Sequence, residues 1–321
     1  MRGQVAVLVA AVALLAPAPA AAHLRTSRVA VDYRAAVSPL APDLASALSV
    51  RLYRADLAVR LAVHSGHRLV VLGYAGEPFL RLEHGEVLVN AASPTAAGAG
   101  LTQSGAGWHV LARSPSLTWH DARIRGLPSG VDRGTWSLPL VVDGQHARLR
   151  GTIDRVSAPS RVGWLVLGVV FAALTAVLLA WRPRRALRTA CIVLGAVSAI
   201  AALVTAAGFS AASTASEGVW VESANEAVFV LVGSIFLFRG SRDSRAMAGG
   251  FLGLVALAAG LTRAPVLTHG IVLAALPGQL VRPAVVVAIG AGAAAAILGV
   301  VVFFDVLEHY EDPELKRVAR S

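Results

Sequence analysis

The stretch VGWLVLGVVFAALTAVLLAW, residues 162–181, runs for twenty residues without a charged side chain. Because the hydrocarbon core of a bilayer is about 30 Å thick, a helix needs about twenty apolar residues to cross it, and this stretch predicts a transmembrane helix. Trp164 and Trp181 stand near its ends, where an interfacial aromatic belt would place them. Residues before 162 carry frequent charges, whereas long uncharged runs dominate after it. This shift marks the main domain boundary.

Four further apolar stretches follow the first one. The chain as a whole is 56% hydrophobic and only 15% charged, whereas soluble domains carry about 25% charged residues. We therefore expect residues 158–306 to form an all-α transmembrane bundle of about five helices, followed by a cytoplasmic tail at 307–321. The predicted spans lie near 162–181, 189–209, 219–238, 246–261 and 283–304.

The arginines between these stretches predict the orientation of the chain in the membrane. Basic residues gather in the loop after the first span and in the loop after the third, and none lies in the loop after the second. Cytoplasmic loops carry the excess of Lys and Arg, so both loops and the C-terminus are expected in the cytoplasm. We expect a multi-pass plasma-membrane protein whose N-terminal domain is extracytoplasmic. The net charge of +10 then reflects topology, and we expect the bilayer, not nucleic acid, as the partner.

One segment of the membrane region allows two interpretations. Residues 264–280 are uncharged and apolar but contain Pro265, His269, Gly270 and Pro277. We expect an interfacial or re-entrant piece on the outer face. The alternative is a sixth span, which would place the basic tail outside.

The N-terminus has the pattern of a cleavable signal peptide at 1–22. Arg2 gives a positive start, Val5–Leu15 is a short apolar run, and Ala20 begins a small-residue cleavage site. The apolar run is too short to span a bilayer. Cleavage would leave His23 at the mature N-terminus, and an uncleaved anchor is the alternative.

Residues 23–157 are expected to form an extracytoplasmic, antiparallel β-sandwich-like domain. Apolar residues alternate with polar ones in several short runs, including 68–74, 86–90 and 135–142, and no stretch shows a sustained helical period. Asp143-Gly144 stands between two such runs and predicts a tight hairpin turn. Residues 91–107 are rich in small residues and predict a long flexible loop. The single cysteine, Cys191, excludes a disulfide within the chain.

Histidines in the exported domain suggest a copper site as one interpretation. The candidate metal ligands are His23, His64, His67 and His120, since an N-terminal His chelates Cu(II) through its amine and its imidazole together. The mature domain lacks Met and Cys, the soft ligands of Cu(I). Exposed or hydrogen-bonded histidines without metal are the simpler interpretation, so no cofactor is the primary expectation.

Two other groups of polar residues are candidate binding residues. In Trp119-His120-Asp121 a carboxylate stands beside an imidazole, but neighbours on a strand point to opposite faces, so a direct contact needs a turn. Glu222 and Glu226 lie four residues apart on one predicted helix face, and carboxylates in membrane segments favour a functional role. With His269 they are expected to line an outward-facing polar cavity, unless they lie in water at the interface.

A nine-residue stretch from Gly73 to Arg81, Gly-Tyr-Ala-Gly-Glu-Pro-Phe-Leu-Arg, resembles a motif in a group of uncharacterised actinobacterial membrane proteins. The resemblance covers most of residues 29–160 and implies the same layout of signal, exported domain and helices. Several members carry a second His two residues after His120, where this chain has Ala122. We expect the glycines to permit a tight bend, and Glu77 to pair with Arg81. Within the stretch, Tyr74, Glu77 and Arg81 are the candidate binding residues.

The sequence lacks a phosphate-cradling glycine loop, a nucleophile elbow and a zincin histidine pair, so we do not expect an enzyme. The leading hypothesis is an envelope membrane protein whose β-domain binds a ligand or a protein partner outside the cell. The alternatives are copper handling at the envelope and transport of a small solute or ion through the helical bundle.

Overall fold

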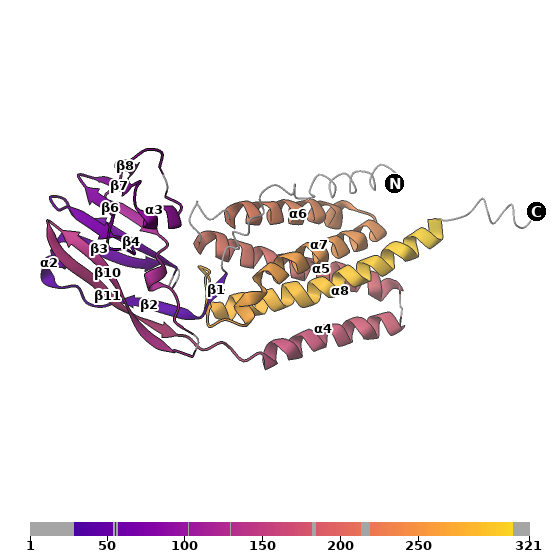
Figure 1. Cartoon of the computed structure of the whole chain (residues 1–321). Helices are drawn as coiled ribbons and strands as arrows, with labels where there is room; N and C mark the ends of the chain where they lie inside the picture. The colour runs from indigo at the N-terminus through magenta and orange to yellow at the C-terminus, as the bar shows by residue number, and fades with distance from the viewer. Residues whose placement is uncertain are drawn as a thin grey trace, which may run out of the picture.

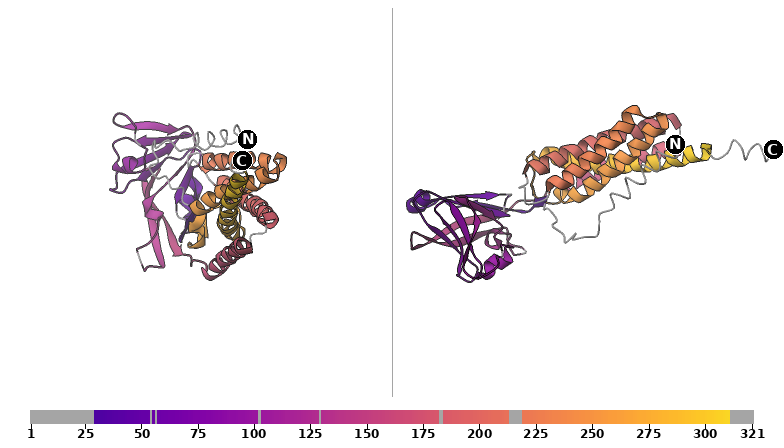
Figure 2. Two further views of the ribbon diagram at one scale, coloured as in Figure 1. Left: turned by 90° about the vertical axis from the view of Figure 1, so that its right-hand side faces the viewer. Right: turned by 90° about the horizontal axis from the view of Figure 1, so that it is seen from above.

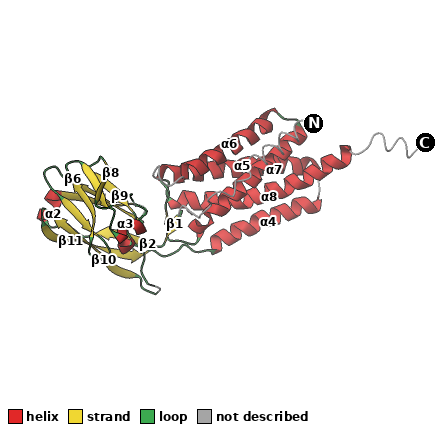
Figure 3. Ribbon diagram, turned by 45° about the horizontal axis from the view of Figure 1, so that its top comes forward, coloured by secondary structure: helices red, strands yellow, loops and turns green. Residues whose placement is uncertain are grey.

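The computed structural model describes residues 29–53, 55, 57–101, 103–128, 130–181, 184–212 and 219–310. The predicted signal peptide, His23 and the end of the predicted tail lie outside these residues. An N-terminal β-domain and a C-terminal bundle of helices lie end to end, and the chain passes from one to the other at residues 156–161 (Figures 1 and 3).

The β-domain consists of two antiparallel sheets, as predicted. The larger has seven strands, in the order β2 (Tyr33–Val37), β11 (Gln145–Arg155), β10 (Arg133–Val142), β5 (Leu69–Leu72), β6 (Pro78–Glu83), β7 (Glu86–Asn90) and β8 (Trp108–Ala112). The smaller has three strands, β3 (Leu48–Tyr53), β4 (Ala58–Val63) and β9 (Ser116–Trp119). Each strand pair in both sheets is antiparallel.

The core of the domain lies between the two sheets, because alternate residues of each strand point inward. Val59 and Leu61 of the smaller sheet pack in one cluster with Leu69 and Val71 of the larger sheet, and all four are fully buried. The ring of Phe79 meets Trp119 across this interface edge to face, with centroids 6.4 Å apart. This packing of two sheets around one core confirms the predicted sandwich.

The turns of the domain were predicted better than its short helices. Asp143 and Gly144 have φ of 50° and 86° and close the β10–β11 hairpin, which confirms the predicted turn. The predicted loop at 91–107 contains a short helix, α3 (Pro94–Gly98), and another, α2 (Pro42–Ala47), precedes β3. One turn of helix is too short to show a period, and the side chain of Ser93 that caps α3 is a purely local signal.

Among the residues that the structure describes, five helices are long and apolar enough to cross a membrane, so the chain is a multi-pass membrane protein. They are α4 (Val162–Trp181), α5 (Arg184–Ala212), α6 (Val219–Arg239), α7 (Arg242–Arg263) and α8 (Gly278–Tyr310). Helices α5, α7 and α8 extend several residues beyond the predicted spans, and α6 extends by one, because each helix continues past the charged residues that end the apolar run. Three of these extensions meet at Arg188 of α5, which pairs with Asp243 of α7 at 3.0 Å and with Asp305 of α8 at 3.3 Å.

Glycines allow α5, α7 and α8 to pack closely. Gly249 of α7 faces Gly195 of α5, and a Cβ on either residue would overlap the backbone of the other helix. Gly250 faces Gly299 of α8 in the same way. Within a bilayer the hydrophobic effect does not drive helices together, so close van der Waals packing at such small residues stabilises their association instead. Helix α4 lies at the side of the bundle, mainly along α8, with most of its apolar side chains exposed (Figures 1 and 3).

The segment between α7 and α8 does not form a sixth span, so that alternative is wrong. It contains a 3₁₀ turn, η3 (Ala264–Leu267), and a two-residue strand, β12 (Ile271–Val272). This strand pairs antiparallel with β1 (Ala30–Val31), so Ala30 lies opposite Val272 and Val31 opposite Ile271. Proline and glycine break the helical pattern here, and the freed backbone groups bond to the start of the β-domain. The segment therefore lies at the end of the bundle that meets the β-domain (Figure 2).

The pairing of β1 with β12 predicts a disulfide in a double variant, Ala30→Cys with Val272→Cys. Leu273 donates to the carbonyl of Val29, so the Ala30–Val272 pair is the closely spaced, non-hydrogen-bonded type, with Cα atoms about 4.5 Å apart. Under mild oxidation, mass mapping of the purified chain is expected to find these two residues linked. Two cysteines that both stay open to alkylation would contradict the pairing.

Candidate functional site

The motif from Gly73 to Arg81 forms the turn between β5 and β6 and the first four residues of β6. The amide of Gly73 donates to the carbonyl of Glu77 at 2.7 Å, and the amide of Gly76 donates to the carbonyl of Gly73. Gly76 has a φ of 82°, which side chains rarely adopt. At Gly73 the reason is space, because a Cβ there would overlap the Glu77 carboxylate and the hydroxyl of Thr95. The expected tight bend is confirmed.

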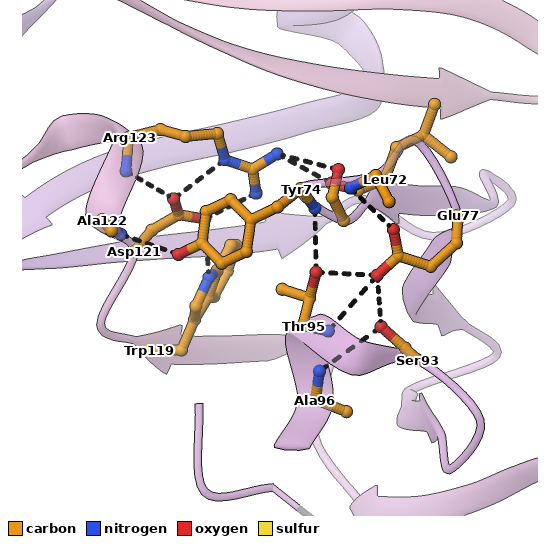
Figure 4. Close-up of polar contacts among 12 residues, drawn as sticks. Leu72, Tyr74, Glu77, Ser93, Thr95, Ala96, Trp119, Asp121, Ala122 and Arg123 are labelled. Atoms are coloured by element: carbon orange, nitrogen blue, oxygen red, sulfur yellow. Dashed lines mark hydrogen bonds and ion pairs between the residues drawn. The ribbon is translucent and has the colours of Figure 1, made fainter. Parts of the chain in front are cut away.

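Glu77 is the centre of a hydrogen-bond network that joins this turn to helix α3 (Figure 4). Its Oε1 accepts from the hydroxyls of Ser93 and Thr95 at 2.6 and 2.7 Å, and its Oε2 accepts from the amide of Ala75 at 3.0 Å. The Thr95 hydroxyl in turn accepts from the amide of Tyr74 at 2.8 Å. The carboxylate thus holds the turn and the start of α3 as one unit.

This network lowers the pKa of Glu77. Partial burial raises the pKa of a carboxyl group, but the hydrogen bonds from Ser93, Thr95 and the backbone outweigh it and lower the pKa from 4.5 to about 2. Hydrogen bonds that favour the charged form stabilise the fold only while the carboxylate is ionised.

The expected ion pair between Glu77 and Arg81 is wrong. Arg81 pairs with Glu83 instead, at 2.8 Å, and its guanidinium lies 4.7 Å from the ring centroid of Trp108. Arg81 lies within β6, where alternate residues share a face, so its side chain lies beside that of Glu83. Glu77 lies before the strand and turns toward α3.

A second network surrounds Asp121, whose side chain is buried. Its carboxylate accepts from the guanidinium of Arg123 at 2.7 and 2.9 Å and from the indole of Trp119 at 3.1 Å. Burial raises its pKa, but the bonds and positive charge of Arg123 outweigh burial, so the net pKa is lowered. Arg123 also lies 4.9 Å from the ring of Tyr74, whose hydroxyl accepts from the amide of Ala122 at 2.9 Å. The two networks meet at Tyr74, as Figure 4 shows.

The three candidate metal-ligating histidines that the structure describes, His64, His67 and His120, each have a separate partner. His120 bonds to the carbonyl of Leu57 and does not contact Asp121; His64 bonds to the carbonyl of Ser46, and His67 to Asp143, all at 2.7 Å. Among the residues that the structure describes, no group of three His, Cys, Asp or Glu side chains is placed to hold a metal. His23 lies outside the described residues. The candidate metal ligands that can be located therefore do not converge.

Within the bundle, Glu226 forms a buried ion pair that the sequence analysis missed. Arg263 of α7 donates to both carboxylate oxygens, at 2.6 and 3.2 Å, and also to the hydroxyl of Thr205 on α5 at 2.9 Å. The side chains of Arg263 and Glu226 are only 9% and 8% exposed. Arg263 lies just past the fourth predicted span, so a search for a cation at the same depth as Glu226 would have found it.

The predicted cavity of Glu222, Glu226 and His269 does not form. Glu222 is exposed, whereas Glu226 is buried against Arg263. His269 lies in the segment between α7 and α8, with its Nε2 3.8 Å from the carboxylate of Asp32. The two glutamates lie about 40° apart around α6, as the spacing predicted. Glu222 lies in the first turn of the helix and is exposed, whereas Glu226 lies one turn further into the bundle.

Asp32 joins the β-domain to the bundle. Its carboxylate accepts from the amide of Gly270 at 3.0 Å, and its backbone carbonyl accepts from the amide of Val156 at 2.7 Å. Arg282 of α8 holds the other side of this segment by donating to the carbonyls of Val266, His269 and Gly270 at 2.9 to 3.0 Å. We call Asp32, Val156, His269, Gly270 and Arg282 the joint.

Comparison of the chain with protein-family models, with curated proteins and with solved structures finds no match.

The Glu77 network predicts a pH-dependent loss in Glu77→Gln. At neutral pH the variant is expected to lose about 1–2 kcal/mol, because neutral bonds replace charge-assisted ones. Since the native pKa is lowered, the contribution is present above 4.5 and is lost as the pH falls toward 2, so the wild type and the variant converge in acid. Calorimetry of the detergent-solubilised chain at pH 7, 4 and 3 measures this, with Glu86→Gln as control, since the Glu86 carboxylate forms a 3.7 Å ion pair with the exposed Arg113. A difference that stays constant with pH would contradict the network.

The Glu226–Arg263 pair predicts a large effect of Glu226→Gln. Removing one charge leaves Arg263 buried without a counter-ion, which costs about 3–5 kcal/mol in buried pairs. Thermal unfolding in detergent is expected to show a clear drop in melting temperature that Arg263→Gln, added to the same chain, partly reverses. Glu222→Gln on the same helix is the control and is expected to have almost no effect. Equal losses in Glu222→Gln and Glu226→Gln would count against the buried pair.

Proposed function

We propose that this chain is a plasma-membrane protein whose extracytoplasmic β-domain binds a ligand or partner and whose helical bundle anchors that domain and responds to it. The observation that carries this proposal is the joint. A domain that only needed an anchor would require no more than the covalent linker at 157–161. Here strand β1 and Asp32 make a second, non-covalent connection to the segment between α7 and α8.

The joint leads directly into the centre of the bundle. Gly270 and His269, which Asp32 contacts, follow η3, and η3 begins directly after Arg263. Arg263 in turn bonds to α5 and α6 through Thr205 and Glu226. A shift of β1 relative to the bundle would therefore act on a residue that connects three helices.

The distribution of charge supports the proposed orientation. The ion pairs of Arg188 with Asp243 and Asp305 bring the N-terminal ends of α5 and α7 together with the C-terminal end of α8. The joint is at the opposite ends of these helices. If the arginine-rich end faces the cytoplasm, the β-domain lies outside and the C-terminus inside.

The alternative functions gain less from the geometry. The candidate ligands His64, His67 and His120 bond to separate partners, so copper handling has no specific observation in its favour. The guanidinium of Arg263 donates to protein oxygens of α5 and α6. A structural role, in which the buried ion pair connects the helices, therefore explains these two charges without a transported solute. We therefore extend the proposal to neither metal nor transport, and we propose no enzymatic activity.

The variant Asp32→Asn tests the joint in the full chain. It removes the charge that faces Gly270 and His269, and amide exchange is expected to become faster in residues 264–277 while β6 and β7 keep their protection. Hydrogen exchange with mass spectrometry, on chains in lipid nanodiscs, provides the measurement. Asp132→Asn is the matched control, since Asp132 pairs with Arg155 and has no contact with the helices among its described interactions. If both variants left 264–277 equally protected, the joint would not couple the two parts.

A further inference from the structure

The outer face of the larger sheet carries a groove whose arginines take no part in the networks described above. Its volume is about 710 Å³, within the range of small-molecule sites, about 300–1,000 Å³. It is lined by Leu72, Gly76, Pro139, His146, Ala147, Arg148 and Arg150.

The register of the sheet explains why these residues meet. Arg148 on β11 lies opposite Pro139 on β10, and the next residue, Leu140, lies opposite Val71 on β5. The groove therefore crosses three adjacent strands. At the far side Gly76 closes it, and Gly76 belongs to the turn that Glu77 holds against α3. The Glu77 network thus fixes one wall of the groove.

Two exposed arginines give the groove its charge. Arg148 and Arg150 are two residues apart on an extended strand, so they share a face with a spacing of about 7 Å. Neither forms an ion pair with a carboxylate in the part of the chain that the structure describes. Six other arginines of the domain do have such a partner, namely Arg68, Arg81, Arg113, Arg123, Arg133 and Arg155, whereas Arg34, Arg51, Arg60 and Arg125 form no ion pair with a described carboxylate either. Among the described lining residues of the groove there is no Asp or Glu.

We propose that this groove binds a soluble phosphate-bearing ligand with at least two negative charges. The inference rests on the proposed function, for which it supplies the site and the chemistry of the ligand. Guanidinium groups match phosphate oxygens with paired, charge-assisted hydrogen bonds. Leu72 and Pro139 form an apolar floor beside the arginines, as expected for a site that holds an organic phosphate.

The position of the groove favours a soluble ligand over a lipid headgroup of the same membrane. Arg150 precedes Val156, which is part of the joint, by six residues of extended chain, about 20 Å. At physiological salt the field of a charged bilayer surface decays over about 8 Å. Figure 2 shows the domain lying beyond the end of the bundle, not alongside it.

Pyrophosphate binding to the full chain tests the inference. We expect isothermal titration, in phosphatidylcholine nanodiscs at physiological salt, to show saturable binding of one pyrophosphate per chain. The double variant Arg148→Gln/Arg150→Gln is expected to bind about tenfold more weakly or worse. The control Arg113→Gln/Arg133→Gln removes the same charge from exposed arginines that already have carboxylate partners, and it should bind as the wild type does. Melting temperatures of both variants verify that the fold is intact.

Three results would overturn the inference. The first is absence of saturable binding to the wild type, and the second is an equal loss in both double variants, which would indicate general attraction. The third is loss of pyrophosphate binding when the nanodiscs contain phosphatidylglycerol, which would indicate that a lipid headgroup occupies the groove. The pyrophosphate titration and the hydrogen-exchange test of Asp32→Asn measure different sites. A negative titration does not change the exchange expected in residues 264–277, and unchanged exchange in Asp32→Asn does not change the binding expected at the groove. The two proposals can therefore fail separately.

Discussion

The contact of the Asp32 carboxylate with the amide of Gly270 determines how the two parts of the molecule are arranged. A single linker at 157–161 would let the β-domain swing relative to the helices. The second connection requires an acceptor on one part and a free backbone donor on the other. Gly270 supplies that donor, and only glycine fits there, because a Cβ would overlap the carbonyl of Val156. The same Val156 donates to the carbonyl of Asp32, so both connections converge on one residue.

Two carboxylates, the partly buried Glu77 and the buried Glu226, are stabilised by different partners in different surroundings. Glu77 is surrounded by hydroxyl and amide donors, which need no positive charge and which order a turn of the β-domain. Glu226 lies among apolar helices, where a buried charge needs a counter-ion, and Arg263 supplies it together with contacts to a third helix. In each case the carboxylate joins elements that the chain connects only at a distance. We infer that both are architectural, and that ligand recognition is to be found elsewhere.

Local patterns explain which features could be predicted from sequence. The apolar run at 162–181, the alternation in 135–142 and the turn at Asp143-Gly144 depend on neighbouring residues, and each prediction is confirmed. The partners of Glu77 lie sixteen and eighteen residues away, and Arg263 is thirty-seven residues from Glu226. No rule based on sequence spacing connects such distant pairs. The expected Glu77–Arg81 contact joined Glu77 to the nearest arginine in the sequence, and it was wrong. The pairing of β1 with β12 joins segments still further apart.

Strand β11 links the candidate ligand groove to the joint. Arg148 and Arg150 extend from its outer face, and immediately after its end Val156 bonds to Asp32. Two like charges about 7 Å apart on one strand face repel each other, so they bring no stability to the free domain. A bound anion would relieve that repulsion and fix the face of β11, while the wall at Gly76 stays rigid. Because β11 also pairs with β2, which directly follows Asp32, an adjustment at the groove has a continuous hydrogen-bonded path to the residue that contacts the bundle.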